Sequence, residues 1–298
     1  MAKPRELGRR IKSVQSTRKI TKTMELVATS KLKRAQDRVV GARPYAAALA
    51  AVIGDLYAPD LAERFPLLRQ PGAAAIRRVA VVLITSNRGL CGAFNANLIR
   101  EARRRMEELE SQGAAVELHL VGKKGIGYFK FAKRPVASQR SDIGDKPTPV
   151  HAAELVAPLV TRFAAGALDA VDVVFAQFKS AVSTPPTTLR ILPVAPPARP
   201  AGRPLKDVAG RQAVYILKPS AAAILERLLP MYVENQMYRA LVETAAAEHG
   251  ARRTAMKNAT DNAGDMIELL QRTYNRARQA QITQEIAEIV GGAEALKG

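Results

Sequence analysis

The residues best placed to do chemistry form the turn Asn87-Arg-Gly-Leu-Cys-Gly-Ala-Phe-Asn95. This turn follows an apolar run typical of a strand and precedes a helical pattern, which is the position of a phosphate-binding turn. It carries two glycines, short of the full Gly-x-Gly-x-x-Gly fingerprint, and it has no Gly-Lys-Thr of a P-loop. We therefore predict a tight structural turn here, with nucleotide binding as the less favoured alternative.

The other reactive side chains are few and scattered. Cys91 is the single cysteine; it has no evident base partner for a nucleophilic role and excludes a disulfide framework or a cysteine-rich zinc site. His119, His151 and His249 lie too far apart for a local pair of metal ligands. No nucleophile elbow, zinc motif or pair of carboxylates appears. We predict no catalytic residue, no cofactor and no metal on this chain.

The charge is strongly biased in sign. The 298 residues hold 46 Lys plus Arg against 27 Asp plus Glu, a net charge of +19, which predicts an anionic partner. Residues 1–43 hold 13 basic and 3 acidic residues, 44–218 hold 24 and 14, and 219–298 hold 9 and 10. Aromatic residues are only 5%, which disfavours a stacking single-strand binder. Three interpretations of the basic first segment remain open. They are a solvated helix face, a DNA-binding basic helix, and a helix that docks on an acidic protein.

Residues 1–57 read as one long helix, because no glycine lies between Gly8 and Gly41. Its apolar residues form two narrow stripes at steps of four and three, the second out of register by two. The stripes are Leu7, Ile11 and Val14, then Ile20, Met24 and Val27. A helix with so little apolar surface is expected to pack against a partner along one narrow apolar stripe. Pro44 predicts a bend or a break.

Residues 210–298 are helical again and carry a heptad-like apolar seam with one stutter. The seam is Ile224, Leu228, Met231, Asn235, Tyr238, Val242 and Ala245, then Ala263, Ile267, Leu270, Tyr274 and Ala277, then Ile282, Ile286, Ile289, Ala293 and Leu296. Pro230 predicts a kink or a fresh helix start. Because neither terminal helix is stable alone in water, we expect the two to pair as an antiparallel coiled coil.

In the middle of the chain, residues 75–205, the spacing of apolar residues changes from that of a long helix to that of alternating strands and helices. Strands are predicted at 78–85, 116–122, 171–178 and 187–193, with a weaker one at 136–140, and helices at 94–110, 125–131 and 153–167. Near-continuous apolar strands alternating with helices indicate a mainly parallel, Rossmann-like α/β sheet. The proline-rich residues 193–204 are an extended connection out of this domain. The predicted fold class is α/β, with two long terminal helices added.

The sequence predicts a soluble, intracellular protein. Its longest purely apolar run, residues 45–53, falls far short of the ~20 residues that span a bilayer. The basic N-terminus has no apolar stretch after it and so is no secretory signal. Any membrane association is expected through partners or surface charge.

Three blocks of the sequence resemble the gamma subunit of F-type ATP synthases. They are Ile11–Lys31 (IKSVQSTRKITKTMELVATSK), Thr85–Gly92 (TSNRGLCG), and Ala255–Gly264 (AMKNATDNAG) continuing to Tyr274–Ile286 (YNRARQAQITQEI). The blocks lie in all three segments and in the family's order, so the resemblance covers nearly the whole chain. The two-cysteine insertion of chloroplast forms is absent, which favours a bacterial-type subunit.

The resemblance implies the central rotor shaft of the enzyme. Such a shaft couples proton flow through the membrane sector to ATP synthesis or hydrolysis at beta-subunit sites by rotation. The implied partners are the alpha and beta subunits, the epsilon subunit and the c ring, at the cytoplasmic face of the bacterial inner membrane. A basic coiled-coil nucleic-acid-binding protein is the alternative reading of the charge.

The resemblance also implies contact residues, carried over position by position. Those expected against the beta subunit are Lys19, Lys22, Met24, Arg252, Arg278, Gln279 and Thr283. For Met24, a plain seam residue is an equally good interpretation. Tyr215 and Lys218 are expected against the c ring and epsilon, although Lys218 stands where some bacterial relatives carry an acidic residue.

Overall fold

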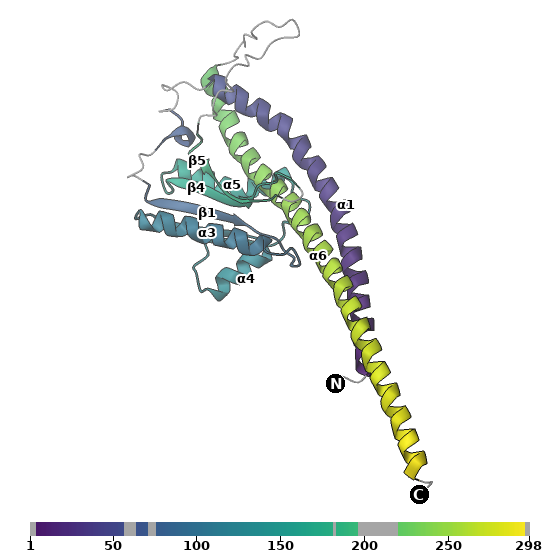
Figure 1. Cartoon of the computed structure of the whole chain (residues 1–298). Coiled ribbons are helices and arrows are strands. Elements are labelled where there is room, and N and C mark those ends of the chain that lie inside the picture. Colours follow the sequence, from purple (N-terminus) through teal and green to yellow (C-terminus); the bar gives the residue numbers. More distant parts are fainter. Residues whose placement is uncertain (1–3, 57–63, 71–75, 181–182, 196–219, 296–298) are drawn as a thin grey trace, which may run out of the picture. The chain divides into compact units, whose positions relative to one another are not determined.

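The computed structural model describes residues 4–56, 64–70, 76–180, 183–195 and 220–295 (Figure 1). The chain divides into two compact units. The α/β unit comprises residues 30–251, and the helix-pair unit comprises residues 1–29 and 252–298. Helices α1 (Pro4–Leu56) and α6 (Ala221–Ala295) contribute residues to both units.

Five strands form one sheet in the α/β unit. They are β1 (Arg78–Ile84), β2 (Ala115–Val121), β3 (Ser138–Arg140), β4 (Ala170–Ala176) and β5 (Pro186–Leu192), in the order β3-β2-β1-β4-β5. The first four strands are parallel and β5 is an antiparallel edge strand. Helices α3 (Phe94–Ser111), α4 (Lys123–Phe131) and α5 (Pro149–Ala164) connect the parallel strands, and the short 3-10 helix η1 (Pro66–Leu68) precedes β1. The predicted mainly parallel α/β sheet is confirmed.

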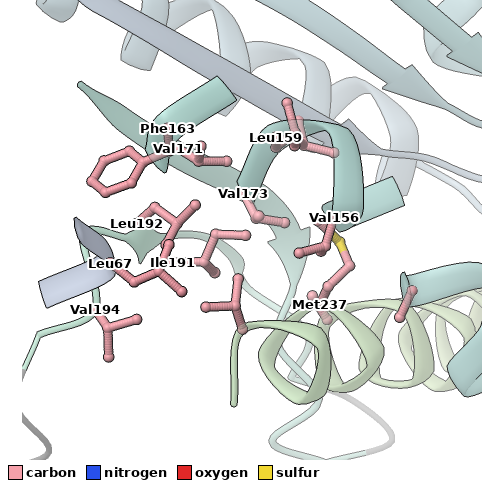
Figure 2. Packing of buried hydrophobic residues seen from close by; sticks show 14 of the residues in the cluster. Leu67, Val156, Leu159, Phe163, Val171, Val173, Ile191, Leu192, Val194 and Met237 are labelled. Carbon is pink, nitrogen blue, oxygen red and sulfur yellow. The ribbon is translucent and has the colours of Figure 1, made fainter. Parts of the chain in front are cut away.

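Buried apolar side chains cover both faces of this sheet. Successive residues of a strand point to opposite faces, so Val82 joins a cluster with η1, α5 and part of α6, whereas Val81 joins a cluster with α3 and α4. Figure 2 shows the first cluster, to which Phe163 of α5, Val173 of β4 and Met237 of α6 contribute. The near-continuous apolar strands of the sequence therefore match a sheet that is buried on both sides.

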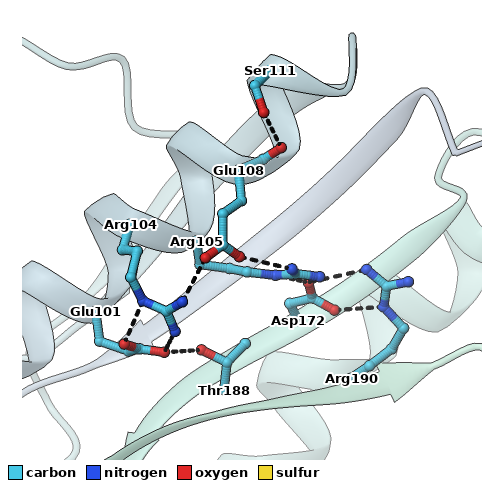
Figure 3. A network of polar contacts seen from close by, with 8 residues as sticks. All are labelled: Glu101, Arg104, Arg105, Glu108, Ser111, Asp172, Thr188 and Arg190. Atoms are coloured by element: carbon cyan, nitrogen blue, oxygen red, sulfur yellow. Dashed lines mark hydrogen bonds and ion pairs between the residues drawn. The ribbon is translucent and has the colours of Figure 1, made fainter.

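A charged network ties α3 to β4 and β5 (Figure 3). Asp172 of β4 is 0% exposed and accepts hydrogen bonds from Arg105 of α3 at 2.8 Å and from Arg190 of β5 at 2.7 Å. Beside it, Thr188 of β5 donates to Glu101 of α3 at 2.9 Å. The buried carboxylate is thus paired with two guanidinium groups, which is the condition for tolerating a charge in a protein interior.

In the helix-pair unit, α1 and α6 run antiparallel. The Thr260 hydroxyl donates to the Thr21 oxygen at 2.8 Å, and Gly8 lies close enough to Tyr274 that an added Cβ would sit 3.9 Å from its ring. The numbers of facing residues add to 281 or 282, so one rises along α1 as the other falls along α6. The predicted antiparallel pairing of the two terminal helices is confirmed within this unit.

The two prolines inside the long helices do not end them. Helix α1 continues through Pro44 and α6 continues through Pro230, so the break predicted as one option at Pro44 and the fresh start predicted as one option at Pro230 are wrong. Each proline removes one backbone hydrogen bond. Buried Ile53 after Pro44, and buried Leu229 and Val233 around Pro230, hold the flanking turns against the core.

Helix α1 alone among the described helices is long and apolar enough to cross a membrane by length and composition. One 18-residue stretch of it has a mean hydropathy of 1.3, with 17% of that stretch buried. Leu49, Ile53 and Leu56 of the same helix belong to the core of the α/β unit. A core helix of a soluble protein meets the same criterion, so this is weak support for a membrane span.

The predicted domain limits at residues 57, 75, 205 and 210 all fall outside the described residues, as does most of the proline-rich connection 193–204. They stay predictions.

Candidate functional site

The seam of the helix-pair unit is thin. Its buried residues, among those that the structure describes, are Leu7, Thr21 and Ala28 of α1 and Met256, Thr260, Ala263 and Ile267 of α6. The α1 residues are spaced by multiples of seven, and the α6 residues by four, three and four, which is the heptad spacing of a coiled coil. Two hydroxyl groups that bond each other occupy the middle of the seam, so its register is fixed by a polar contact as well as by packing.

The second apolar stripe predicted on α1 does not join this seam. Ile20 and Val27 are exposed and Met24 is half-buried, because the heptad that starts at Leu7 brings Thr21 to the seam instead. Ile20 and Val27 therefore lie on the outside of the helix pair, and Met24 is partly covered.

Exposed apolar side chains gather on the helix-pair unit. Of 15 large hydrophobic residues that are exposed in the described structure, nine belong to this unit, although it holds about a quarter of the chain. They are Ile20, Leu26, Val27, Met266, Leu269, Ile282, Ile286, Ile289 and Val290. Apolar surface gathered in this way marks a site for a protein partner.

All seven residues predicted to contact the beta subunit lie in the helix-pair unit. Lys19 is exposed, and Lys22 is exposed with an ion pair to Glu25 at 3.2 Å. Arg252, at the start of the α6 part of the unit, is half-buried.

The remaining three predicted contacts lie near the end of the paired stretch. By the register, the first described residue of α1, Pro4, faces about residue 278 of α6. Arg278, Gln279 and Thr283 are all exposed there. Further along, Ile286 continues the exposed apolar stripe of α6.

The two residues predicted against the c ring and epsilon, Tyr215 and Lys218, lie outside the described residues.

The turn after β1 uses its polar groups internally. The Ser86 amide donates to the Asn95 side chain at 3.0 Å, and Asn95 in turn donates to the Cys91 sulfur at 3.2 Å. The Asn87 side chain donates to the Ile143 carbonyl at 2.9 Å. Leu90 has a φ of 63°, in the left-handed region, as expected of a tight turn. These bonds give the turn a structural role.

The three histidines lie on three different elements. His119 on β2 contacts Ser138 at 2.6 Å, His151 belongs to the capping box of α5, and His249 is buried in α6. Burial lowers the pKa of His119, since desolvation disfavours its charged form. Among the described residues, no group of three metal-ligating side chains comes together.

An ionic cluster inside the α/β unit joins the loop before α5 to α1. Lys31 pairs with the Asp145 carboxylate, and Arg38 donates to the Asp145 carbonyl at 3.2 Å. Burial acts to raise the pKa of Asp145, but the Lys31 hydrogen bond and the charges of His249 and Arg88 outweigh it and lower the pKa. Lys31 and Arg38 of helix α1 therefore have their polar partner within this chain.

Sequence reasoning missed four of the exposed apolar residues: Leu26, Met266, Leu269 and Val290. They fall between the positions of the seam, so a search for heptad spacing passes over them. The signal that could have found them is the presence of large apolar residues at helix positions that the partner helix does not cover.

The fold and the surface together define a class of protein: an α/β domain whose two terminal helices form an antiparallel pair with apolar residues turned outward. The chain belongs to the gamma chain family of ATP synthases. The family model described as ATP synthase matches residues 3–296.

Several curated relatives are similar over their whole length. The ATP synthase gamma chain of Gemmatimonas aurantiaca is 61% identical over 298 residues, covering 100% of both chains. The ATP synthase gamma chain of Moorella thermoacetica is 47% identical over 299 residues, again covering 100% of both. The resemblance found in the sequence is confirmed, and the nucleic-acid-binding alternative gains no support.

Solved structures share the fold. One is the rotor part of the mitochondrial ATP synthase of Euglena gracilis, with a TM-score of 0.64 at 20% identity, covering 94% of this chain and 98% of that chain. A central stalk and c-ring structure from Tetrahymena thermophila has a TM-score of 0.58 at 23% identity, covering 80% of this chain and 99% of that chain.

Proposed function

We propose that this chain is the central rotor shaft of a bacterial F-type ATP synthase. By rotating, it couples proton flow through the membrane sector to ATP synthesis or hydrolysis at beta-subunit sites. Its partners are the alpha and beta subunits, the epsilon subunit and the c ring. It carries no catalytic site, and the complex holds it at the cytoplasmic face of the inner membrane.

The observation that carries this proposal is the outward apolar surface of the helix-pair unit. A pair of helices that has already formed its seam gains nothing in water from Leu26, Met266 or Leu269 on the outside. A ring of subunits around the helices gives these side chains an apolar environment.

The proposed contacts with the beta subunit lie towards the two ends of the helix-pair unit. Lys19 and Lys22 present positive charge to an acidic part of beta, beside Met24. At the other end, Arg278 and Gln279 offer donor groups to a polar loop of beta. Thr283, Arg252, Tyr215 and Lys218 keep the roles that the resemblance gives them.

Coupling then follows from asymmetry. Two different helices present a different surface to each beta subunit, so each site experiences different contacts. Those differential contacts shift each site's equilibrium between conformations, and turning the shaft cycles every site through them. The driving energy is about 2.3 kcal/mol per proton for each 100 mV of membrane potential.

Co-expression with alpha and beta tests the assembly. The proposal predicts that the chain purifies in one complex with both subunits and that the complex hydrolyses ATP. Steep salt-dependent binding to DNA, without such a complex, would favour the nucleic-acid-binding reading.

The contact role of Arg278 and Gln279 is tested by the double variant Arg278→Ala, Gln279→Ala. We expect ATP synthesis to fall severalfold while assembly stays largely intact, because both side chains are exposed and absent from the seam. The matched control is Gln271→Ala, Arg272→Ala, the same residue types one heptad earlier and also exposed. A normal rate of synthesis in the first variant would show that the assigned contact is wrong.

A further inference from the structure

The outer face of helix α4 carries only positive charge. Lys123, Lys124 and Lys130 are exposed. Lys123 and Lys130, at i and i+7, lie on one side of the helix about 10 Å apart along its axis, and Lys124 lies about 100° around the helix from Lys123. Lys133 is exposed in the turn that follows. Within the part of the chain that the structure describes, Arg134 pairs with Glu110, but no carboxylate pairs with these four lysines.

An aromatic side chain stands at the end of this face. Phe131 is 88% exposed, more than any other large hydrophobic residue that the structure describes. The two other aromatic residues of α4, Phe129 and Tyr128, make contacts within the α/β unit. Phe129 is buried against the sheet, and the Tyr128 ring packs edge-on against it at 5.1 Å. The Tyr128 hydroxyl also accepts a hydrogen bond from Arg103 of α3 at 3.3 Å.

The helix is held firmly in place behind this face. The Gly125 amide donates to the Thr85 hydroxyl at 2.9 Å, and the Lys123 amide donates to the Asn87 side chain at 2.9 Å. A Cβ added at Gly125 would lie 2.9 Å from that same hydroxyl, so the helix approaches the sheet as closely as it can. The exposed side chains are therefore displayed from a rigid element, which lowers the entropy that a partner must overcome.

The residue that follows the end of α4 is not of the type that its backbone conformation favours. Lys133 has a φ of 51°, at a left-handed position after a helix where glycine is preferred. The turn is closed by the Arg134 amide, which donates to the Phe129 carbonyl at 3.1 Å. A lysine at this strained position keeps positive charge next to Phe131.

We propose that the α4 face (Lys123, Lys124, Lys130, Phe131 and Lys133) is a docking site for an acidic segment of another subunit of the complex. The lysines meet carboxylates of that segment, and Phe131 inserts into an apolar recess between them. Aromatic residues are enriched at the buried centre of protein interfaces, and polar groups lie at the solvent-accessible rim around that centre. The charges steer and orient the partner, and the aromatic ring provides the buried contact.

A protein partner fits this face better than an anionic membrane does. A helix that lies on a membrane inserts a broad apolar side opposite its basic one. The apolar side of α4, including Phe129, is already buried in the α/β unit, so only Phe131 is free to insert. A single ring among lysines makes marginal membrane contact, whereas it is enough to anchor a protein interface.

Site-specific photocrosslinking in the assembled ATP synthase tests this inference, which rests on the proposed function for its use of the complex. Phe131 is replaced by p-benzoylphenylalanine, the purified complex is illuminated, and the captured peptide is identified by mass spectrometry. We expect capture of a segment rich in Asp and Glu from another subunit. The triple variant Lys123→Glu, Lys124→Glu, Lys130→Glu is expected to lower the yield roughly tenfold, and the matched Lys→Arg triple to retain it.

The control places the same photoreactive residue at Val150, an exposed apolar position on α5 without adjacent lysines; it should not capture the same segment. Capture of lipid from vesicles that contain phosphatidylglycerol, capture of a neutral segment, or no capture at position 131 would each overturn the inference. Because the complex must first copurify with alpha and beta, failure of assembly refutes the proposed function, and failure of crosslinking in an intact complex refutes only this docking site.

Discussion

Removing the Asp172 carboxylate is expected to destabilise the α/β unit strongly. Asp172→Ala leaves Arg105 and Arg190, which it bridges at 2.8 and 2.7 Å, without the carboxylate that neutralises them. Loss of one partner from a buried ion pair costs about 3–5 kcal/mol. We expect the lower end, about 3 kcal/mol, because Arg105 keeps Glu108 at 3.2 Å and the Arg190 side chain is 32% exposed and can turn towards water.

Urea unfolding followed by circular dichroism measures this loss. With a slope of about 3 kcal/mol per molar for a chain of this size, 3 kcal/mol lowers the midpoint by about 1 M. The control is Glu107→Ala, whose carboxylate pairs with Arg103 on the same helix α3 with both side chains more than half exposed. An exposed pair of this kind contributes under about 1 kcal/mol, so the midpoint should barely move.

A double-mutant cycle with Arg190→Ala then isolates the pair. If the buried charge drives the effect, the double variant should be less destabilised than the sum of the two single variants, because Asp172 and Arg190 act together. A midpoint shift for Asp172→Ala no larger than that for Glu107→Ala would contradict a stabilising role of the buried carboxylate.

Two further predictions concern register and charge. The double variant Thr21→Cys, Thr260→Cys should form a disulfide under mild oxidation, because the two hydroxyl oxygens are 2.8 Å apart. The disulfide is seen as a shift on a non-reducing gel, and Cys91 does not interfere because it is buried. Cysteines that stay reduced after oxidation would disprove the register of the two helices. The hydrogen bond from Arg140 holds the pKa of Asp142 at about 2, below its ordinary 3.8, so the pair stabilises the fold fully above about pH 4 and loses this effect as the pH falls towards 2. Exposure limits the gain to under about 1 kcal/mol; NMR titration of the Asp142 carboxyl checks it, and an ordinary pKa would contradict the ion pair.

Much of the fold was predictable because local patterns determine it. The continuous apolar run at β1 predicted a strand buried on both faces, and the heptad spacing through Ile267 and Tyr274 predicted a paired helix. The effect of Pro44 was not predictable from spacing alone, because the packing of Ile53 behind it decides that the helix continues. The Asp172 network was equally hidden, since its partners lie 18 and 67 residues away.

The candidate site was predictable in position more than in detail. The resemblance placed Arg278 and Gln279 on α6, and the structure adds that they lie near the end of the paired stretch. The sequence could not reveal that Ile20 faces outward, because its stripe has the same spacing as a seam. Only the partner helix decides which of two equally spaced stripes is buried.

Rotation of the chain within the complex tests the central claim most directly. A cysteine introduced by Val150→Cys, on the exposed start of α5, carries a gold bead while the complex is fixed to a surface through beta. We expect unidirectional rotation of the bead when MgATP is added and none without it. Hydrolysis of ATP at the full rate with a stationary bead would contradict it.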